Sequence, residues 1–298
     1  MLATGFPPIV GCSDFAPADD TCQRVNCDNS DDGPDLWSCL GAPAGDRPTP
    51  GGTVTYEIPI VDYITQSLAD GLVVQLCNNT DVSCNAPNAV VPRGVDNAVD
   101  DGIRVQLAQG FGEVSFIRVL STSVTGTVDI DLNGDGMTPD PDVYIPYAYY
   151  FGDTVFTERV VQPNFQLLRV SNVDELATGA NITLDQTRAL TIVRAYDCLD
   201  NPAEGVTFRI TYVGDDGGDL PQPFTVYNGL PFTPDERTDF LVTDRDGQGG
   251  FANVPFGNMQ VFASINGQEF GPVTATAARG QITAVEVHAR RFGRPIDD

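Results

Sequence analysis

The 298-residue chain contains no lysine and a single histidine, and all 16 of its basic residues are arginine. Without lysine there is no amine for Schiff-base or serine–lysine chemistry. A serine or cysteine hydrolase would have to use His288, and no Gly-x-Ser-x-Gly turn is present to hold a nucleophile. His288 lies in an alternating segment near the C-terminus, where a structural role is the simpler interpretation. The sequence therefore predicts a protein that is not an enzyme.

Basic charge is also scarce, because 41 acidic residues give the chain a formal net charge of −25 at pH 7. Such a charge repels phosphate backbones and anionic lipid headgroups, so we expect no nucleic-acid partner and no electrostatic binding to membranes. No apolar run approaches the roughly 20 residues that span a bilayer. A solvated acidic surface is the simpler interpretation of the charge, and binding of multivalent cations is the alternative.

The seven cysteines include no Cys-x-x-Cys pair, and structural zinc is therefore poorly supported. Cys12 follows Ile9-Val10-Gly11, and this tetrad resembles a bacterial lipobox, whose cysteine carries a lipid anchor. Residues 1–11 lack the basic start of an export signal, so a chance match stays open. The other six cysteines predict three disulfides in an oxidising compartment. We expect a Cys77–Cys84 disulfide, because six intervening residues can close a turn, and the other pairings stay open.

The composition divides the chain into an acidic stalk and two β-rich units. Residues 1–52 form a leader and a Cys-containing stalk that is too polar to order itself by apolar burial alone. Trp37, beside Cys39, is a candidate to anchor the end of the stalk on the first unit, although simple packing is its plainer role. Later segments alternate β-branched or aromatic residues with polar ones between Gly, Asp and Pro turns, which is typical of antiparallel β-sandwiches.

The predicted fold is therefore all-β: two tandem antiparallel Ig-like or prealbumin-like sandwiches with one short connecting helix. Ser171 and Asp174 provide a weak capping box, and Gly179 suits the end of that helix. The first unit spans 53–170, the connector 171–188 and the second unit 189–298. The expected strands are 53–58, 71–77, 103–107, 113–119, 143–147, 165–170, 190–196, 205–210, 224–227, 250–255, 259–265 and 282–288.

An internal repeat supports this duplication. Asp101-Gly102, Phe111-Gly112 and Phe116 return 145 residues later, without a gap, as Asp246-Gly247, Phe256-Gly257 and Val261. Upstream, residues 69–76 match residues 203–210, which lie 134 positions further along the chain. Repetition on this scale indicates one β-unit used twice.

The second unit resembles the carboxypeptidase-regulatory-like, or prealbumin-like, β-sandwich. The resemblance rests on Pro202-Ala203-Glu204-Gly205-Val206, on the Thr243–Phe251 segment with its Asp246-Gly247 turn, and on Asn253-Val254-Pro255-Phe256-Gly257. The first unit lacks the Val-Pro-x-Gly step, so its assignment depends on the repeat. The layout, with Trp37-Ser38-Cys39-Leu40-Gly41 closing an acidic stalk, also resembles surface lipoproteins of myxobacterial type. This resemblance implies an exported, lipid-anchored surface protein and no specific activity.

Residues 131–142 resemble an EF-type calcium loop. Asp131, Asn133 and Asp135 stand at positions 1, 3 and 5, Met137 offers its carbonyl at position 7, and Asp142 stands at position 12. These residues predict a structural Ca²⁺ site that makes a long loop rigid. A plain acidic turn is the alternative, because the chain is rich in aspartate.

Tyrosines near this loop provide a candidate ligand contact. Alternation places Tyr147 and Tyr149 on one face of a strand and Tyr150 on the other. If these tyrosines are exposed, they would suit contact with a surface glycan or a protein partner. The competing interpretation is that they pack in the core. The main functional hypothesis is an extracellular, lipid-anchored, non-catalytic binding or adhesion module. The alternatives are a self-associating subunit of a surface layer or extracellular fibre, and a hydrolase that uses a carboxylate pair.

Overall fold

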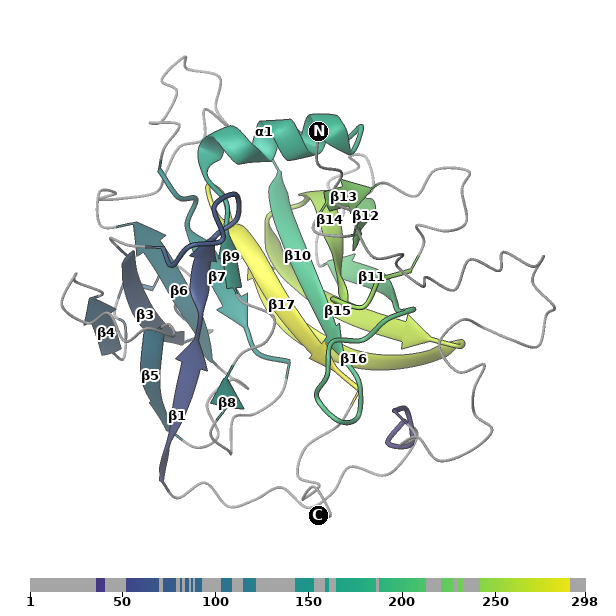
Figure 1. Ribbon diagram of the computed structural model, residues 1–298, viewed down its shortest axis with the longest axis horizontal. Coiled ribbons are helices and arrows are strands. Elements are labelled where there is room, and N and C mark those ends of the chain that lie inside the picture. The colour runs from purple at the N-terminus through teal and green to yellow at the C-terminus, as the bar shows by residue number, and fades with distance from the viewer. Residues whose placement is uncertain are drawn as a thin grey trace, which may run out of the picture. The chain divides into compact units, whose positions relative to one another are not determined.

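The fold is known from a computed structural model of the chain (Figure 1). The structure describes residues 36–40, 52–69, 72–78, 81, 84, 85, 87, 89–92, 103–108, 115–121, 143–152, 159–160, 165–185, 188–212, 221–227, 230–232 and 242–289. Helix α1 spans Val170–Gly179, and the strands are β1 (Thr53–Ile58), β2 (Ile60–Asp62), β3 (Leu72–Asn78), β4 (Ala89–Pro92), β5 (Ile103–Ala108), β6 (Ser115–Ser121), β7 (Tyr147–Tyr150), β8 (Arg159–Val160), β9 (Phe165–Leu167), β10 (Ala189–Tyr196), β11 (Thr207–Tyr212), β12 (Gln222–Tyr227), β13 (Leu230–Phe232), β14 (Gln248–Val254), β15 (Gly257–Ile265), β16 (Gln268–Ala277) and β17 (Ile282–His288).

The described chain is almost all β with one short helix, as predicted. Strands form where β-branched and aromatic residues alternate with smaller or polar ones, because such side chains fit a pleated, half-buried surface. Among the described residues, α1 is the one helix, and it is too short and too polar to cross a membrane.

Both predicted units use the same pattern of strand pairing, which is the structural form of the sequence repeat. In the first unit β1 pairs antiparallel with β5 and parallel with β8, and β6 lies antiparallel between β3 and β7. In the second unit β10 pairs antiparallel with β14 and parallel with β17, and β15 lies antiparallel between β11 and β16. Each unit is therefore a sandwich built from two sheets of corresponding topology.

The two sandwiches are nevertheless joined through one sheet. Strand β17 pairs in parallel with β7 of the first unit, from Ile282 opposite Tyr147 to Val285 opposite Tyr150. This pairing creates a nine-stranded sheet in the order β13-β12-β14-β10-β17-β7-β6-β3-β4, in which β17 lies between β10 and β7 (Figure 1). Residues 35–298 accordingly form one compact unit. The two tandem sandwiches expected from the sequence thus share one sheet.

The two cores lie on opposite faces of this sheet. One face carries Leu190 and Ile192 of β10 with Ile282 and Ala284 of β17, and it continues into the first unit's core around Tyr147. We call it the α1 face, because helix α1 packs on it over β10. The other face of β10 and β17 is covered by the β11-β15-β16 sheet, and we call it the sandwich face. It is lined by the buried side chains of Thr191, Val193, Ala195, Thr283, Val285 and Val287.

The N-cap of helix α1 lies two residues before the predicted cap. Arg169 is the N-cap residue, and its backbone N–H donates to Asn172 Oδ1 at 3.1 Å. The cap is therefore the hydrogen bond between the Arg169 backbone and the Asn172 side chain, and it does not involve the predicted Ser171 and Asp174. Gly179 is the last helical residue, close to its predicted place.

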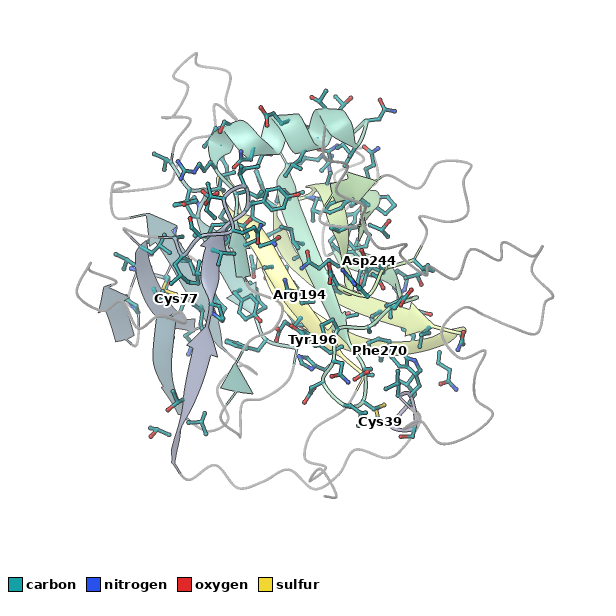
Figure 2. All side chains as sticks on the ribbon, in the orientation of Figure 1. Cys39, Cys77, Arg194, Tyr196, Asp244 and Phe270 are labelled. Atoms are coloured by element: carbon teal, nitrogen blue, oxygen red, sulfur yellow. A yellow bond between two sulfur atoms is a disulfide. The ribbon has the colours of Figure 1, made fainter. Side chains whose placement is uncertain are left out.

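Two disulfides link the described residues. Cys77 and Cys84, the pair proposed from the sequence, are bonded with Cα atoms 5.3 Å apart. Cys39 bonds to Cys198 in the second unit, and the Trp37 ring lies 5.9 Å from the Phe270 ring (Figure 2). The stalk end is therefore attached to the second unit. The expected attachment to the first unit is wrong, because the partner of Cys39 lies beyond β10, in a loop that only the fold brings close.

Candidate functional site at the junction of the two sandwiches

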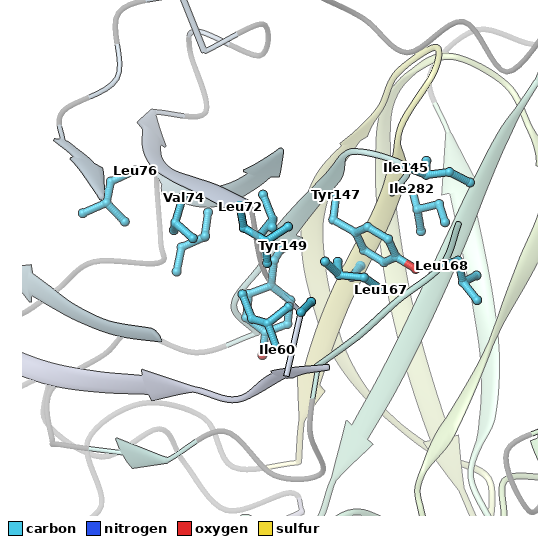
Figure 3. Packing of buried hydrophobic residues seen from close by; sticks show 14 of the residues in the cluster. Ile60, Leu72, Val74, Leu76, Ile145, Tyr147, Tyr149, Leu167, Leu168 and Ile282 are labelled. Carbon is cyan, nitrogen blue, oxygen red and sulfur yellow. The ribbon is translucent and has the colours of Figure 1, made fainter. Parts of the chain in front are cut away.

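The predicted tyrosine contact surface lies inside the protein. Tyr147, Tyr149 and Tyr150 are 1%, 3% and 2% exposed. Tyr147 and Tyr149 pack in the first unit's core (Figure 3), whereas Tyr150 points to the opposite face and stacks on Phe116 with ring centroids 5.0 Å apart. The predicted alternation of the three tyrosines between the two faces of the strand is confirmed, whereas their exposure to solvent is not. Strand β7 lies between β6 and β17, and both of its faces are covered, so the packing interpretation holds.

Two other predicted sites lie outside the described residues. These are the lipidation site Cys12 and the calcium loop formed by Asp131, Asn133, Asp135, Met137 and Asp142. Within the described part of the chain, no group of three or more His, Cys, Asp or Glu side chains is placed to hold a metal ion.

His288 belongs to a buried polar chain that continues to the surface. Its Nδ1 lies 2.9 Å from Asp200 Oδ1, and its Nε2 lies 3.3 Å from Glu286 Oε2. The Tyr196 hydroxyl donates to Glu286 Oε1 at 2.7 Å, and the Tyr196 and His288 rings stack at 4.5 Å. His288 is 4% exposed, and it therefore packs inside the protein with both ring nitrogens next to carboxylates. Sequence reasoning missed Glu286, because a charged residue in an alternating strand usually faces solvent.

Arg194 lies next to these polar side chains, on the side nearer to helix α1. It lies opposite Glu286 in the parallel pairing of β10 with β17, and opposite Gln248 in the antiparallel pairing with β14. Burial opposes the positive charge, yet the neighbouring Tyr196, Tyr149 and Glu286 raise the pKa of Arg194 above its ordinary value. Gln248, Arg194 and Glu286 thus form a polar row across three adjacent strands, with the Arg194 guanidinium charged.

A pocket lies between this polar row and helix α1. Its volume is about 960 Å³, counting the part open to solvent. The walls are mainly apolar and come from both sandwiches and from the helix. The residues that line it include Tyr63, Tyr147, Leu168, Val173, Leu176, Ala177, Ile182, Leu184, Leu190, Ile192, Phe224, Val226 and Ala252, with Gln248, Arg194 and Glu286 at the polar row.

Two groups of polar contacts, which we call clasps, hold helix α1 and the loop that follows it over the pocket. At the start of α1, Arg169 Nε and the Tyr144 hydroxyl each lie 2.8 Å from Asp62 Oδ2. Beyond the end of α1, Asn253 accepts from the Asp185 backbone N–H at 2.7 Å and donates to the Thr183 carbonyl at 2.8 Å.

Burial by itself would raise the pKa of Asp62. The hydrogen bonds that Asp62 accepts from the Thr65 backbone, Arg169 and Tyr144 outweigh this effect and lower its pKa to about 2. Asp62 is therefore ionised at neutral pH and holds the helix start to the first unit.

The pocket does not contain the carboxylate pair that the hydrolase alternative requires. Glu286 is the one carboxylate among the residues that line it, and both of its oxygens already have hydrogen-bond partners in Tyr196 and His288. A glycosidase needs two facing carboxyl groups on either side of the scissile bond. The described geometry is that of a binding or packing cavity.

Comparison with known proteins identifies no family, because no protein-family model and no curated protein matches the chain. Among solved structures, the chain aligns with the shaft pilin SpaA from Lactobacillus rhamnosus GG at 9% identity, covering 82% of this chain and 99% of that one, with a TM-score of 0.22. It aligns with BcpA, the major pilin subunit of Bacillus cereus, at 10% identity, 80% and 99% coverage and a TM-score of 0.22. A streptococcal ancillary pilin gives 12% identity, 79% and 68% coverage and a TM-score of 0.22. Scores this low support no inference about function.

Proposed function

We propose that the protein is a non-catalytic structural subunit of an extracellular layer or fibre. The observation that carries the proposal is the shared nine-stranded sheet, which couples both sandwiches through backbone hydrogen bonds at β7 and β17. A continuous sheet resists bending at the junction, as a spacer or layer subunit requires. The two disulfides support export, because such bonds persist in oxidising compartments. The adhesion hypothesis, in contrast, loses the tyrosine surface on which it depended.

Strand β11 supports contact between copies. Among the described residues it pairs with β15 alone, so its other edge presents backbone donors and acceptors. Thr207, Arg209 and Thr211 are exposed along this strand. Open edges of this kind pair with a strand from another chain without any reactive chemistry, and a polymer forms where that strand comes from a different surface of the next copy.

The acidic charge opposes such contact at low ionic strength. With a net charge of −25, two copies repel one another unless salt or multivalent cations screen them. Assembly should therefore be promoted by salt and, at lower concentrations, by Ca²⁺. Anchoring through Cys12 would place the layer at the outer cell surface, and this part of the proposal remains a prediction.

Light scattering and negative-stain microscopy on the full chain test the proposal over a range of protein and salt concentrations. We expect ordered polymers that grow with screening. Thr211→Lys, on the β11 edge, should raise the concentration at which polymers form by about tenfold, since edge lysines oppose strand addition. Gln260→Lys is the matched control, because Gln260 is exposed opposite Thr211 on the central strand β15. A monomer under all conditions would contradict the proposal.

A further inference from the structure

We infer that the pocket beneath α1 is a binding site for an uncharged, mainly apolar molecule with one polar group, such as a long-chain alcohol or a monoacylglycerol. This site goes beyond the structural role proposed above and does not depend on it. The inference combines three features of the pocket: its partly exposed apolar lining, its apolar rows and the neutral charge balance of its polar row.

The lining of the pocket suits a small molecule. Ligand pockets are lined by apolar and aromatic side chains with a few placed polar groups. The α1 pocket has such a lining, and its interior volume of about 110 Å³ is continuous with a wider part that is open to solvent. Its wall residues Leu184, Leu190, Ile192 and Val226 are only partly buried, so the protein leaves apolar surface there for a ligand to cover.

The floor of the pocket is ordered in rows by the register of the sheet. Leu190 lies opposite Ile282, and Ile192 lies opposite Ala284 and Gly250. These rows are apolar, and the next row toward the C-terminal end of β10 is the polar row. An elongated ligand can therefore lay its chain along the apolar rows and its polar group at the end.

Gly250 lets Phe224 form part of the wall. A Cβ atom at this position would lie 2.6 Å from Phe224 Cζ and 2.1 Å from the Thr191 carbonyl oxygen. A larger residue would push the Phe224 ring off the sheet. The small residue and the buried aromatic ring thus maintain the width of the pocket together.

The polar row decides the charge of the ligand. Arg194 is positive and its strand neighbour Glu286 is negative, so the row is close to neutral. An anionic headgroup that approaches Arg194 also meets the Glu286 carboxylate, and a cationic headgroup meets Arg194. A hydroxyl or ester group avoids both repulsions and still finds donors and acceptors, including the Gln248 amide. The charge balance therefore favours an uncharged ligand.

A competition assay on the full chain tests this inference. The neutral dye Nile red serves as the probe, and 1-dodecanol, dodecanoate and dodecyltrimethylammonium, which share one alkyl chain, serve as competitors. We expect dodecanol to displace the dye at a concentration about tenfold lower than either ion, which corresponds to about 1.4 kcal/mol. Equal or better displacement by either ion would overturn the charge argument.

Pocket-filling variants locate the site. Ala177→Phe places a ring in the pocket from the buried side of α1, whereas Thr178→Phe adds the same ring on the exposed side and is the matched control. Val226→Phe fills the pocket from the partly exposed strand β12 if the helix variant folds poorly. Each filling variant should weaken dye binding at least about tenfold, with the control unchanged. No dye binding by the parent protein, or equal binding by all folded variants, would overturn the inference.

Discussion

The α1 face and the sandwich face of β10 and β17 differ in what covers them. On the sandwich face, another sheet lies over the strands and encloses an apolar core in which Val193, Met259 and Val261 are at most 1% exposed. On the α1 face, a ten-residue helix covers part of the same strands and leaves a pocket and a polar row. The same two strands therefore support a closed core on one face and a potential ligand site on the other.

The difference follows from the area that each cover can supply. A helix of ten residues is about 15 Å long and roughly 10 Å wide, so it spans about two strands spaced at 4.8 Å. The sandwich face is covered by three strands, two of which are nine and ten residues long. Polar side chains that the helix cannot reach must find partners among themselves, as Glu286 does in Tyr196 and His288, or must face the pocket.

The largest effect is expected where the polar row is broken. Glu286→Ala removes the acceptor of Tyr196 and His288 and leaves Arg194 without its neighbouring carboxylate. We expect a loss of about 3–5 kcal/mol in the free energy of unfolding, measured by urea denaturation.

Glu269→Ala is the matched control, because Glu269 accepts from Arg209 at 2.7 Å with both side chains exposed. Surface pairs contribute below about 1 kcal/mol. If the two variants lose the same stability, the polar row is not an integral part of the α1 face.

The next largest effect is the loss of stability when an apolar side chain is truncated, which we expect to differ between the two faces. Met259→Ala, on the sandwich face, should cost about 3 kcal/mol, because a fully enclosed cavity forms. Ile192→Ala, on the α1 face, should cost about 1 kcal/mol, because its side chain is partly exposed beside a pocket that already exists. The loss of stability in each variant is measured by its urea unfolding midpoint, provided that the m-values are equal. A larger loss for Ile192→Ala would reverse the comparison between closed and open faces.

The smallest effect is the loss of stability at low pH through Asp62, which holds the start of helix α1. The pKa of Asp62 falls from an ordinary 3.8 to about 2 in the folded protein, so ionised Asp62 stabilises the fold above pH 4. This contribution, about 2 kcal/mol, is lost as the pH falls toward 2, because the folded state must then take up the proton.

Asp62→Asn should therefore lower stability at pH 7 and converge with the parent protein near pH 2. The stability curves of both proteins between pH 2 and 7 measure this effect. Glu175→Gln, on the exposed side of α1, is the control for a change of net charge. If the stability of Asp62→Asn and that of the parent protein differ by the same amount at every pH, the contact of Asp62 with Arg169 does not hold the helix.

Local pattern was enough to predict most strands and the duplication, because alternation and turn residues are properties of neighbouring positions. Strand β16 was missed, since Gly271-Pro272 reads as a break, although an edge strand tolerates proline. The helix start was missed because Arg169 is an unusual cap, and it is held in place by Asp62 from a distant strand. The alternation of the tyrosines was predicted correctly, whereas the sequence left open whether they are exposed or packed in the core, since exposure depends on which strands come to lie on either side.

Composition and residues close in the chain are enough to predict the all-β class, the repeated unit, the acidic charge and the Cys77–Cys84 pair. The three-dimensional fold, in contrast, brings β7 and β17 into one sheet, joins Cys39 to Cys198, and places Gln248, Arg194 and Glu286 in one row below α1. These features join residues that are tens to more than a hundred positions apart. Their proximity is set by strand order and register, which local sequence patterns do not specify.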